Sequence, residues 1–404
     1  MSTPAFVVPP TLDRIRGTAL LVGVVGILAT LVGGAIDATQ FFRSYLFAFL
    51  FWTGIGLGCL SILMIHHLSG GIWGLAIRRL LEAGARTIKI SALLFIPLLF
   101  GLSRVYLWAQ REVVEKDPIL QSKAAYLNVP FFVGRALFYF AVWMALAHFL
   151  SKWSLELDGH RESLHISRRL RSLAGPGLVI MGLTITFSSV DWAMSLDPHW
   201  FSTVYGLLFM VGQVLSAMAL VIVVLALFGR DKPLVDVTRP SVVHDLGKLM
   251  LAFIMLWAYL NLSQFLIIWS GNLPEEIPWY LTRLHGGWQY LALLLVVFHF
   301  ALPFLLLLSR DLKRHARLLA MVAGVVLLMR LVDLFWLIAP NLQGGHGEHA
   351  QHGMTIHWLD FAAPIGMGGL WIAAFARELA GRPLLPLGEP ELTEFIDTPV
   401  HAGH

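Results

Sequence analysis

Ten apolar runs divide this chain, and each is near the ~20 residues that a helix needs to cross a bilayer. They cover approximately 17–36, 44–68, 87–109, 129–151, 176–194, 203–228, 246–270, 286–309, 316–339 and 356–379. Only helices and closed barrels span membranes, because lipid offers no hydrogen bonds to free backbone groups. The sequence lacks the repeated alternation of about ten residues that is typical of barrel strands. It therefore predicts an all-α integral membrane protein with ten transmembrane helices.

The composition excludes the soluble classes of protein. Hydrophobic residues make up 57% of the chain and charged residues 13%, whereas a soluble domain carries about 25% charged residues. The net charge of +4 does not indicate a nucleic-acid partner, because the basic residues lie in loops between apolar runs. The single cysteine excludes a disulfide scaffold, a multi-cysteine zinc domain and an iron–sulfur cluster on this chain.

The distribution of Lys and Arg predicts the orientation. Of the 29 such residues, 21 fall in one alternating set of loops and tails, five in the other set and three inside spans. Basic loops stay on the cytoplasmic side, so we expect both termini in the cytoplasm. The first span is too long for a signal peptide and lacks a small-residue cleavage site, so we expect it to be retained.

Short similarities between the two halves indicate an internal repeat. The segments 189–198 and 331–340 each place a Val-Asp pair ahead of a Pro that closes the helix, and 95–98 resembles 253–256. Each pair is four spans apart, which preserves orientation. We therefore expect two parallel four-helix bundles, made of spans 2–5 and 6–9, with spans 1 and 10 at the periphery.

This repeat predicts the domain boundaries. The expected parts are a cytoplasmic tail 1–16, peripheral span 17–43, bundles 44–194 and 203–339, a His-rich extracytoplasmic loop 340–355, peripheral span 356–379 and a cytoplasmic tail 380–404. In the first bundle, Gly54, Gly56 and Gly58 place small residues at helical spacing, which lets a neighbouring helix approach closely.

We select five charged side chains that fall inside spans, each near the extracytoplasmic end. They are Arg104, Arg135, Asp191, Arg330 and Asp333, and Gln264 lies at comparable depth. A charge at this depth costs roughly 2.5–3.5 kcal/mol and needs a partner, so we expect these groups to converge. Such a cluster can transfer protons or face a quinone headgroup, and it can equally be a set of static salt bridges between helices.

The histidines are the other titratable candidates for proton transfer. His66, His67 and His148 lie at the cytoplasmic ends of their spans, and His299 lies mid-membrane. A b-type haem needs two histidines at matched depth, so we expect no haem here. The loop at 344–353 has His-x-x-His-x-x-His spacing that suits zinc or copper, but its glycines are typical of a solvated loop, and we expect no bound metal.

Two longer strings resemble a known family. SSVDWAMSLDPHWFST at 188–203, and SYLFAFLFWTGIGLG at 44–58 followed by HHLSGG at 66–71, resemble the ActF family of membrane subunits of bacterial alternative complex III. This family belongs to the wider group of NrfD-like, polysulfide-reductase-type membrane subunits. The resemblance covers 17–379.

The resemblance implies a multi-pass subunit of the bacterial inner membrane within a quinol:electron acceptor oxidoreductase. It implies quinol or menaquinol as a possible ligand, with proton passage or scaffolding equally open as the role, and it implies that the chain itself binds no cofactor. The implied partners are a related membrane subunit, a multihaem cytochrome c that carries haem c, and an iron–sulfur subunit. It also favours Asp191 as the functional acid, because Asp191 is the titratable member of the matching string.

Two alternatives to a quinone-binding or proton-translocating subunit stay open. A secondary transporter also has parallel repeats and intramembrane charges. A purely structural anchor for extrinsic subunits would use the same buried polar residues as braces.

Overall fold

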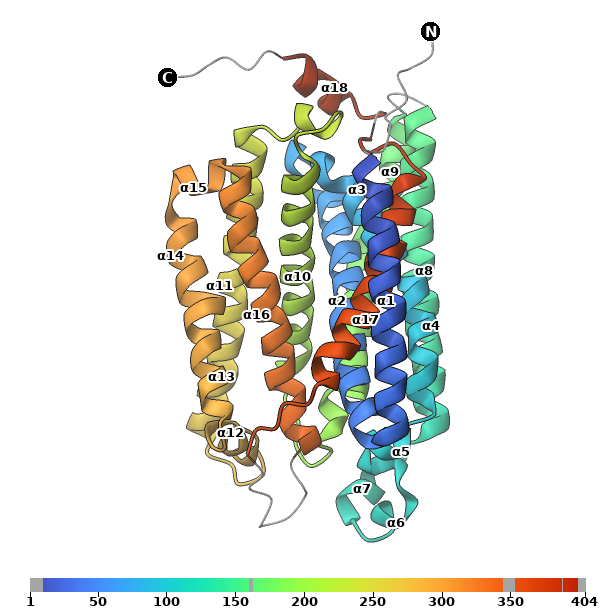
Figure 1. The fold of residues 1–404 in the computed structure, drawn as a ribbon, viewed down its shortest axis with the longest axis vertical. Helices are drawn as coiled ribbons and strands as arrows, with labels where there is room; N and C mark the ends of the chain where they lie inside the picture. The colour runs from blue at the N-terminus through green and yellow to red at the C-terminus, as the bar shows by residue number, and fades with distance from the viewer. Residues whose placement is uncertain (1–9, 160–162, 344–352, 387, 399–404) are drawn as a thin grey trace.

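The computed structural model describes residues 10–159, 163–343, 353–386 and 388–398, and in this part of the chain it contains helices and no strand. Nine helices of the described residues are long and apolar enough to cross a bilayer. They stand side by side along the long axis of the molecule (Figure 1). The prediction of an all-α membrane protein is confirmed.

Eight of the nine are single helices, and the ninth is a run of three consecutive segments. The single helices are α1 Pro10–Ile36, α2 Ala38–Ser69, α8 Val129–Gly159, α9 Leu164–Trp192, α10 Tyr205–Phe228, α11 Pro240–Gly271, α16 Ala316–Gln343 and α17 Leu359–Ala380; the run is α13 Trp288–Leu294, the π-helix η4 Leu295–Ala301 and α14 Leu302–Leu308.

Shorter helices lie at the two ends of the bundle and along α2. They are α3 Ile72–Arg86, α4 Ile88–Leu99, α5 Leu102–Val105, η1 Leu107–Ala109, α6 Arg111–Val114, α7 Pro118–Lys123, η2 Met194–Leu196, η3 Leu234–Asp236, α12 Pro278–Leu284, α15 Arg310–Arg314 and α18 Pro390–Asp397. Figure 1 shows α7 at one end of the bundle and α18 at the other. We refer to these as the α7 end and the α18 end; the charge distribution predicts that the α7 end is extracytoplasmic.

The third predicted span, 87–109, is not one helix. Helix α3 begins directly after the turn at Gly70 and Gly71, which have positive φ angles of 69° and 96°, so most of the predicted loop 69–89 is helical. The helix is interrupted at Thr87, whose hydroxyl donates a hydrogen bond of 2.6 Å to the carbonyl of Gly84. Such a bond competes with the helical ladder. Together α3 and α4 run along α2.

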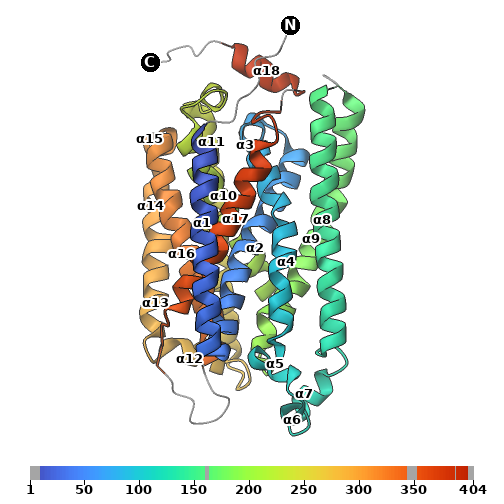
Figure 2. The ribbon, with the colours of Figure 1, turned by 45° about the vertical axis from the view of Figure 1, so that its right-hand side comes forward.

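The helices pack as two groups, and the two groups meet where α2 contacts α10. Helices α2, α3, α4, α8 and α9 contact one another, and α10, α11, η4 and α16 form a second set of contacts. Helix α17 packs on α2 and α3, and α1 packs mainly on α17 (Figure 2). The repeat and the exact domain boundaries stay predictions.

Glycines allow the closest helix contacts. A Cβ at Gly58 would collide with the backbone carbonyl of Gln213 on α10, and one at Gly54 would press on the Gln213 side chain. The predicted close approach at these two glycines is confirmed. Gly56 instead faces Gly84 and Thr87. Helix α2 is consequently the most enclosed spanning helix, with 94% of its apolar window buried.

The contact at Gly58 can be tested by adding one methyl group. We expect Gly58→Ala to lower the free energy of unfolding by about 1–3 kcal/mol, because α2 and α10 must move apart. Denaturant unfolding of the purified protein in detergent measures this loss. Gly324→Ala on α16 is the matched control, because a Cβ there meets nothing within 4 Å. Equal effects of the two substitutions would contradict the contact.

Candidate functional site

Asp191 and Arg135 form a buried ion pair near the α7 end. Asp191 belongs to the last turn of α9 and is fully buried. Arg135 of α8 reaches it with two hydrogen bonds of 2.8 Å, from Nε to Oδ2 and from Nη2 to Oδ1. This two-point geometry is the strong form of an Arg–carboxylate pair. The structure thus brings together two of the residues that the sequence selected.

Two tyrosines complete this pair. The Tyr139 hydroxyl donates a hydrogen bond of 2.8 Å to Oδ2 of Asp191. The Arg135 guanidinium lies 3.8 Å from the Tyr126 ring centroid, and its Nη1 donates to the Tyr126 carbonyl at 3.0 Å. Sequence reasoning missed both tyrosines, although Tyr139 is four residues after Arg135 and therefore on the same helix face.

The segment that contains α5 to α7 holds the end of α9 in place. The Tyr106 hydroxyl donates to the Trp192 carbonyl at 3.0 Å, and Trp108 Nε1 donates to Ser195 Oγ at 3.1 Å. Ser195 Oγ in turn donates to the Asp191 carbonyl at 2.6 Å. The segment 188–203 that the sequence selected therefore contains Asp191 and also packs against the segment from α5 to α7.

Two further contacts join α7 and the residue before it to the turn that follows η2, at the α7 end of the bundle. Lys123 Nζ donates to the Pro198 carbonyl at 2.6 Å, and His199 Nε2 lies 2.6 Å from Asp117 Oδ2. Desolvation pushes the pKa of Asp117 upward, but hydrogen bonds from His199 and from backbone N–H groups outweigh it and hold this pKa below its usual value.

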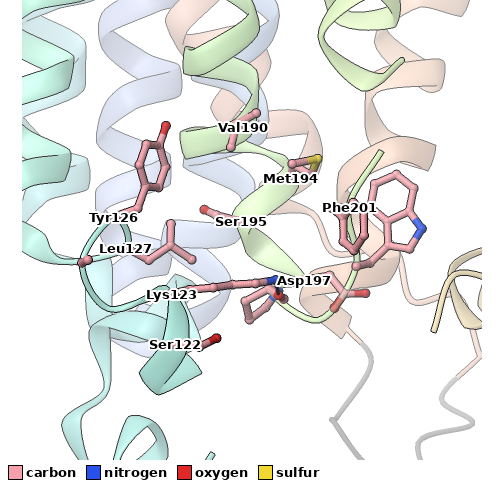
Figure 3. Close-up of a pocket in the computed structure, with 12 residues that line it drawn as sticks. Ser122, Lys123, Tyr126, Leu127, Val190, Met194, Ser195, Asp197 and Phe201 are labelled. Carbon is pink, nitrogen blue, oxygen red and sulfur yellow. Dashed lines mark hydrogen bonds between the residues drawn. The ribbon is translucent and has the colours of Figure 1, made fainter. Parts of the chain in front are cut away.

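A pocket of about 460 Å³ opens beside the ion pair, within the typical size of ligand sites. Figure 3 shows Leu127, Val190 and Met194 among its apolar walls, with Lys123 and Asp197 near one another. Its full lining is Ser122, Lys123, Ala125, Tyr126, Leu127, Val190, Met194, Ser195, Asp197, Pro198, Trp200 and Phe201.

Tyr126 connects the pocket to the ion pair, because it lines the former and covers Arg135 of the latter. Burial raises the pKa of Tyr126, and the negative charge of Asp191 raises it further. The phenol is consequently a neutral hydrogen-bond donor and acceptor at physiological pH. The pocket therefore offers polar groups at one wall and an apolar surface elsewhere.

Arg330 and Asp333 form a second, separate ion pair on α16. Arg330 Nη1 contacts Asp333 Oδ2, and Trp257 Nε1 donates to the same oxygen at 3.1 Å. Arg330 Nε also donates to the Gly212 carbonyl at 3.1 Å, where a Cβ would collide with the guanidinium. None of these contacts involves Arg135 or Asp191. The structure thus shows two ion pairs where the sequence led us to expect a single cluster.

His299 lies beside this second pair. Its ring is 4.3 Å from that of Trp257 in an edge-to-face arrangement, and the residue is fully buried within η4. Neither ring nitrogen has a hydrogen-bond partner among the described residues. Short π-helical segments occur frequently at functional sites.

Three other predicted residues lie away from these pairs. Arg104 is exposed at the end of α5, because the chain leaves its helix at Tyr106. His148 is exposed on α8, where it faces outward from the bundle. Gln264 is buried on α11, and its Oε1 accepts a hydrogen bond of 3.3 Å from Ser202. The expected convergence of Arg104 and Gln264 with the ion pairs is not observed.

His66 and His67 lie at the α18 end within a buried polar network. His66 Nε2 is 3.1 Å from Arg78 Nη2, and Arg78 pairs with Glu389 at 2.6 Å. Arg79 pairs with Glu82 at 2.6 Å and also contacts Asp158. Sequence reasoning placed both arginines in a solvated loop and missed this network.

The histidine network lies beside the start of α9, and Asp191 lies at the end of that helix. Ser167, near the start of α9, lines a crevice with His66 and His67, and 24 helical residues separate it from Asp191, or roughly 36 Å. The His-rich segment 344–352 lies outside the described residues, so its expected lack of metal stays a prediction.

Arg283 is a buried cation that no local pattern in the sequence singles out. It is fully buried and stacks 3.5 Å from the Trp279 ring centroid. Its Nε donates to the Trp336 carbonyl at 3.2 Å and its Nη2 to that of Leu337 at 2.7 Å. Pro340 has no N–H, so the Trp336 carbonyl lacks its helical donor. Burial lowers the pKa of Arg283 to about 9.

Comparison with known proteins gives one informative similarity. A scan against models of protein families gives no match. A selenate reductase subunit of Mesobacillus selenatarsenatis is 23% identical over 232 residues, which is 55% of this chain and 53% of that protein. The chain thus spans about half the length of this curated relative. The relative is a reductase subunit, as the resemblance in the sequence implies for this chain; membership of the ActF family stays a prediction.

A double-mutant cycle tests the first ion pair. We expect Arg135→Gln and Asp191→Asn each to cost about 3–5 kcal/mol, because each leaves a buried charge alone. The double variant should lose less than the sum, with a coupling of about 0.5–3 kcal/mol. Unfolding in detergent provides the measurement, and Arg104→Gln is the near-neutral control. Additive losses would show that the pair is not coupled.

A rescue experiment tests the role of Arg283. We expect Arg283→Met to destabilise the protein by about 1–3 kcal/mol, because the Trp336 carbonyl is then buried without a donor. Pro340→Ala restores a helical N–H, so the same substitution should cost less in that background. Thermal unfolding of the four proteins measures the difference. An equal cost in both backgrounds would refute this explanation.

Proposed function

We propose that this chain is a membrane subunit of a respiratory quinol:electron acceptor oxidoreductase of the alternative complex III type, and that it binds a quinone headgroup beside Arg135 and Asp191. The observation that carries the proposal is the pocket of about 460 Å³ whose wall residue Tyr126 covers Arg135. The similarity to a reductase subunit supports the same assignment.

The chemistry of the pocket suits quinol or menaquinol. A quinone ring is flat and apolar with an oxygen at each end, so it needs apolar walls and a hydrogen-bond partner for each oxygen. Leu127, Val190 and Met194 supply apolar wall, and Lys123 and Ser122 carry donor groups in the lining. Asp197 supplies an acceptor at the same rim.

The ion pair next to this pocket supports a role in proton transfer. Oxidation of a quinol releases two electrons and two protons. We assign the electrons to redox centres of partner subunits, namely haem c and iron–sulfur clusters, and the protons to polar groups of this chain. Asp191 and Tyr139 are a buried acid and a phenol of this ion-pair site, joined by a hydrogen bond of 2.8 Å.

The orientation that we propose follows the positive charges. Both termini lie in the cytoplasm of a bacterium, the α7 end faces outward across the inner membrane, and the related membrane subunit, the multihaem cytochrome and the iron–sulfur subunit pack around this chain. The quinone pocket is then near the outer surface, and His66 and His67 are near the inner surface. Protons released at Asp191 are consequently delivered outside.

Blocking the pocket tests this function. We expect Ala125→Trp in the native complex to reduce bound quinone and to raise the KM for quinol at least tenfold, because the new side chain fills the pocket rim that Ala125 lines. Ala145→Trp on the exposed face of α8 is the control and should leave both values unchanged. Quinone extraction and steady-state quinol oxidation provide the measurements.

Asp191→Asn separates the proposal from its alternatives. We expect it to slow quinol oxidation while partner subunits still copurify. Assembly with unchanged turnover would favour a structural anchor. A chain that purifies alone, without redox partners, and moves solute across liposomes would favour a transporter.

A further inference from the structure

A second crevice, of about 590 Å³, lies between α1, α17 and α2, far along the chain from the pocket at 122–201. Its walls include Val22 of α1, Ile365 of α17 and Trp52 of α2. Among the described residues, Arg14 is the only charged side chain in its lining. The crevice is therefore an apolar groove with a positive charge at one end.

The crevice exists because two helices touch through their backbones. Gly23 packs on Gly369, and Gly26 packs on Gly366, so close that no Cβ fits between the helices. Side chains diverge on either side of such a contact and leave a groove. Trp52 Nε1 donates to the Pro364 carbonyl at 2.8 Å and fixes the floor of this groove.

We propose that this crevice binds an anionic phospholipid, with one acyl chain along the groove and the phosphate against Arg14. The groove faces lipid, because the apolar window of α1 is only 22% buried. Acyl chains surround this surface in a membrane, and an apolar groove there will be filled by one. The proposal is independent of the quinone pocket.

The position and charge of Arg14 select the headgroup. Twenty-two helical residues separate it from Ile36, or roughly 33 Å, which is close to the ~30 Å of the hydrocarbon core. Arg14 therefore lies at headgroup level at the α18 end. Arg16 is paired with Asp13 at 3.5 Å, whereas Arg14 has no carboxylate partner within the described part of the chain and can pair with a phosphate.

The length of the groove suits part of an acyl chain. The lining residues of α1 extend from Arg14 to Val22, which is roughly 12 Å of helix length. A single extended acyl chain is narrow enough to lie along it, with the phosphate at the Arg14 end.

Native mass spectrometry of the full chain, purified with its natural partners, tests the proposal. The probes are phosphatidylglycerol and phosphatidylcholine with identical acyl chains. We expect Arg14→Gln to weaken binding of phosphatidylglycerol about fivefold, the factor equivalent to ~1 kcal/mol for one basic residue at a membrane surface. Phosphatidylcholine should be unaffected. Arg16→Gln is the matched control, because Arg16 does not line the crevice.

Val22→Trp fills the groove without changing its charge and should weaken binding of both lipids. Ile365→Trp fills it from the opposite wall and replaces Val22→Trp if that variant unfolds. Equal effects of Arg14→Gln and Arg16→Gln would overturn the headgroup assignment. Unchanged lipid binding in the filled variants, or loss of a copurifying quinone or protein subunit instead of lipid, would overturn the site.

Discussion

The contact of Gly58 with the backbone of α10 is the constraint on which the rest of this structure depends. Inside a bilayer no hydrophobic force drives helices together, so close packing of small residues must hold them. Because Gly58 has no side chain, α2 and α10 approach closely, and the two groups of helices share one interface. The same close packing recurs where Gly23 and Gly26 meet α17, and there it leaves a groove that faces lipid.

The buried charges are also held by local contacts, because each has a partner among its immediate neighbours. Arg330 and Asp333 share one helix face, three residues apart, and Arg135 and Asp191 join adjacent helices. Arg283 donates instead to backbone carbonyls, one of which Pro340 leaves without its helical donor. Lipid offers no alternative partner, so these contacts are conditions of folding as much as features of a site.

The sequence predicted what depends on local composition and missed what depends on the path of the chain. Apolar length alone identified nine of the ten predicted spans, and the cost of a buried charge selected Asp191 and Arg135. Arg283 looked like a loop residue, because nothing local shows that a short helix folds back onto α16. Arg78 was assigned to a loop for a similar reason: four of the 15 residues of its helix are charged, and nothing local shows that the C-terminal segment packs on it. For Arg104 the prediction was wrong in the opposite sense. Arg104 was expected inside a span, but its helix ends one residue later and its side chain is exposed.

The two ion pairs differ in a way that bears on exchange of a ligand. Asp191 accepts hydrogen bonds from Arg135 and Tyr139 at both carboxylate oxygens, so the empty pocket leaves no buried charge unpaired. Asp333 Oδ1 and both His299 nitrogens have no partner among the described residues, which costs free energy in the absence of water or a ligand. A quinol site must be stable both empty and filled, because its ligand enters and leaves at each turnover. By that criterion the first pair, beside an open pocket, is the better placed of the two.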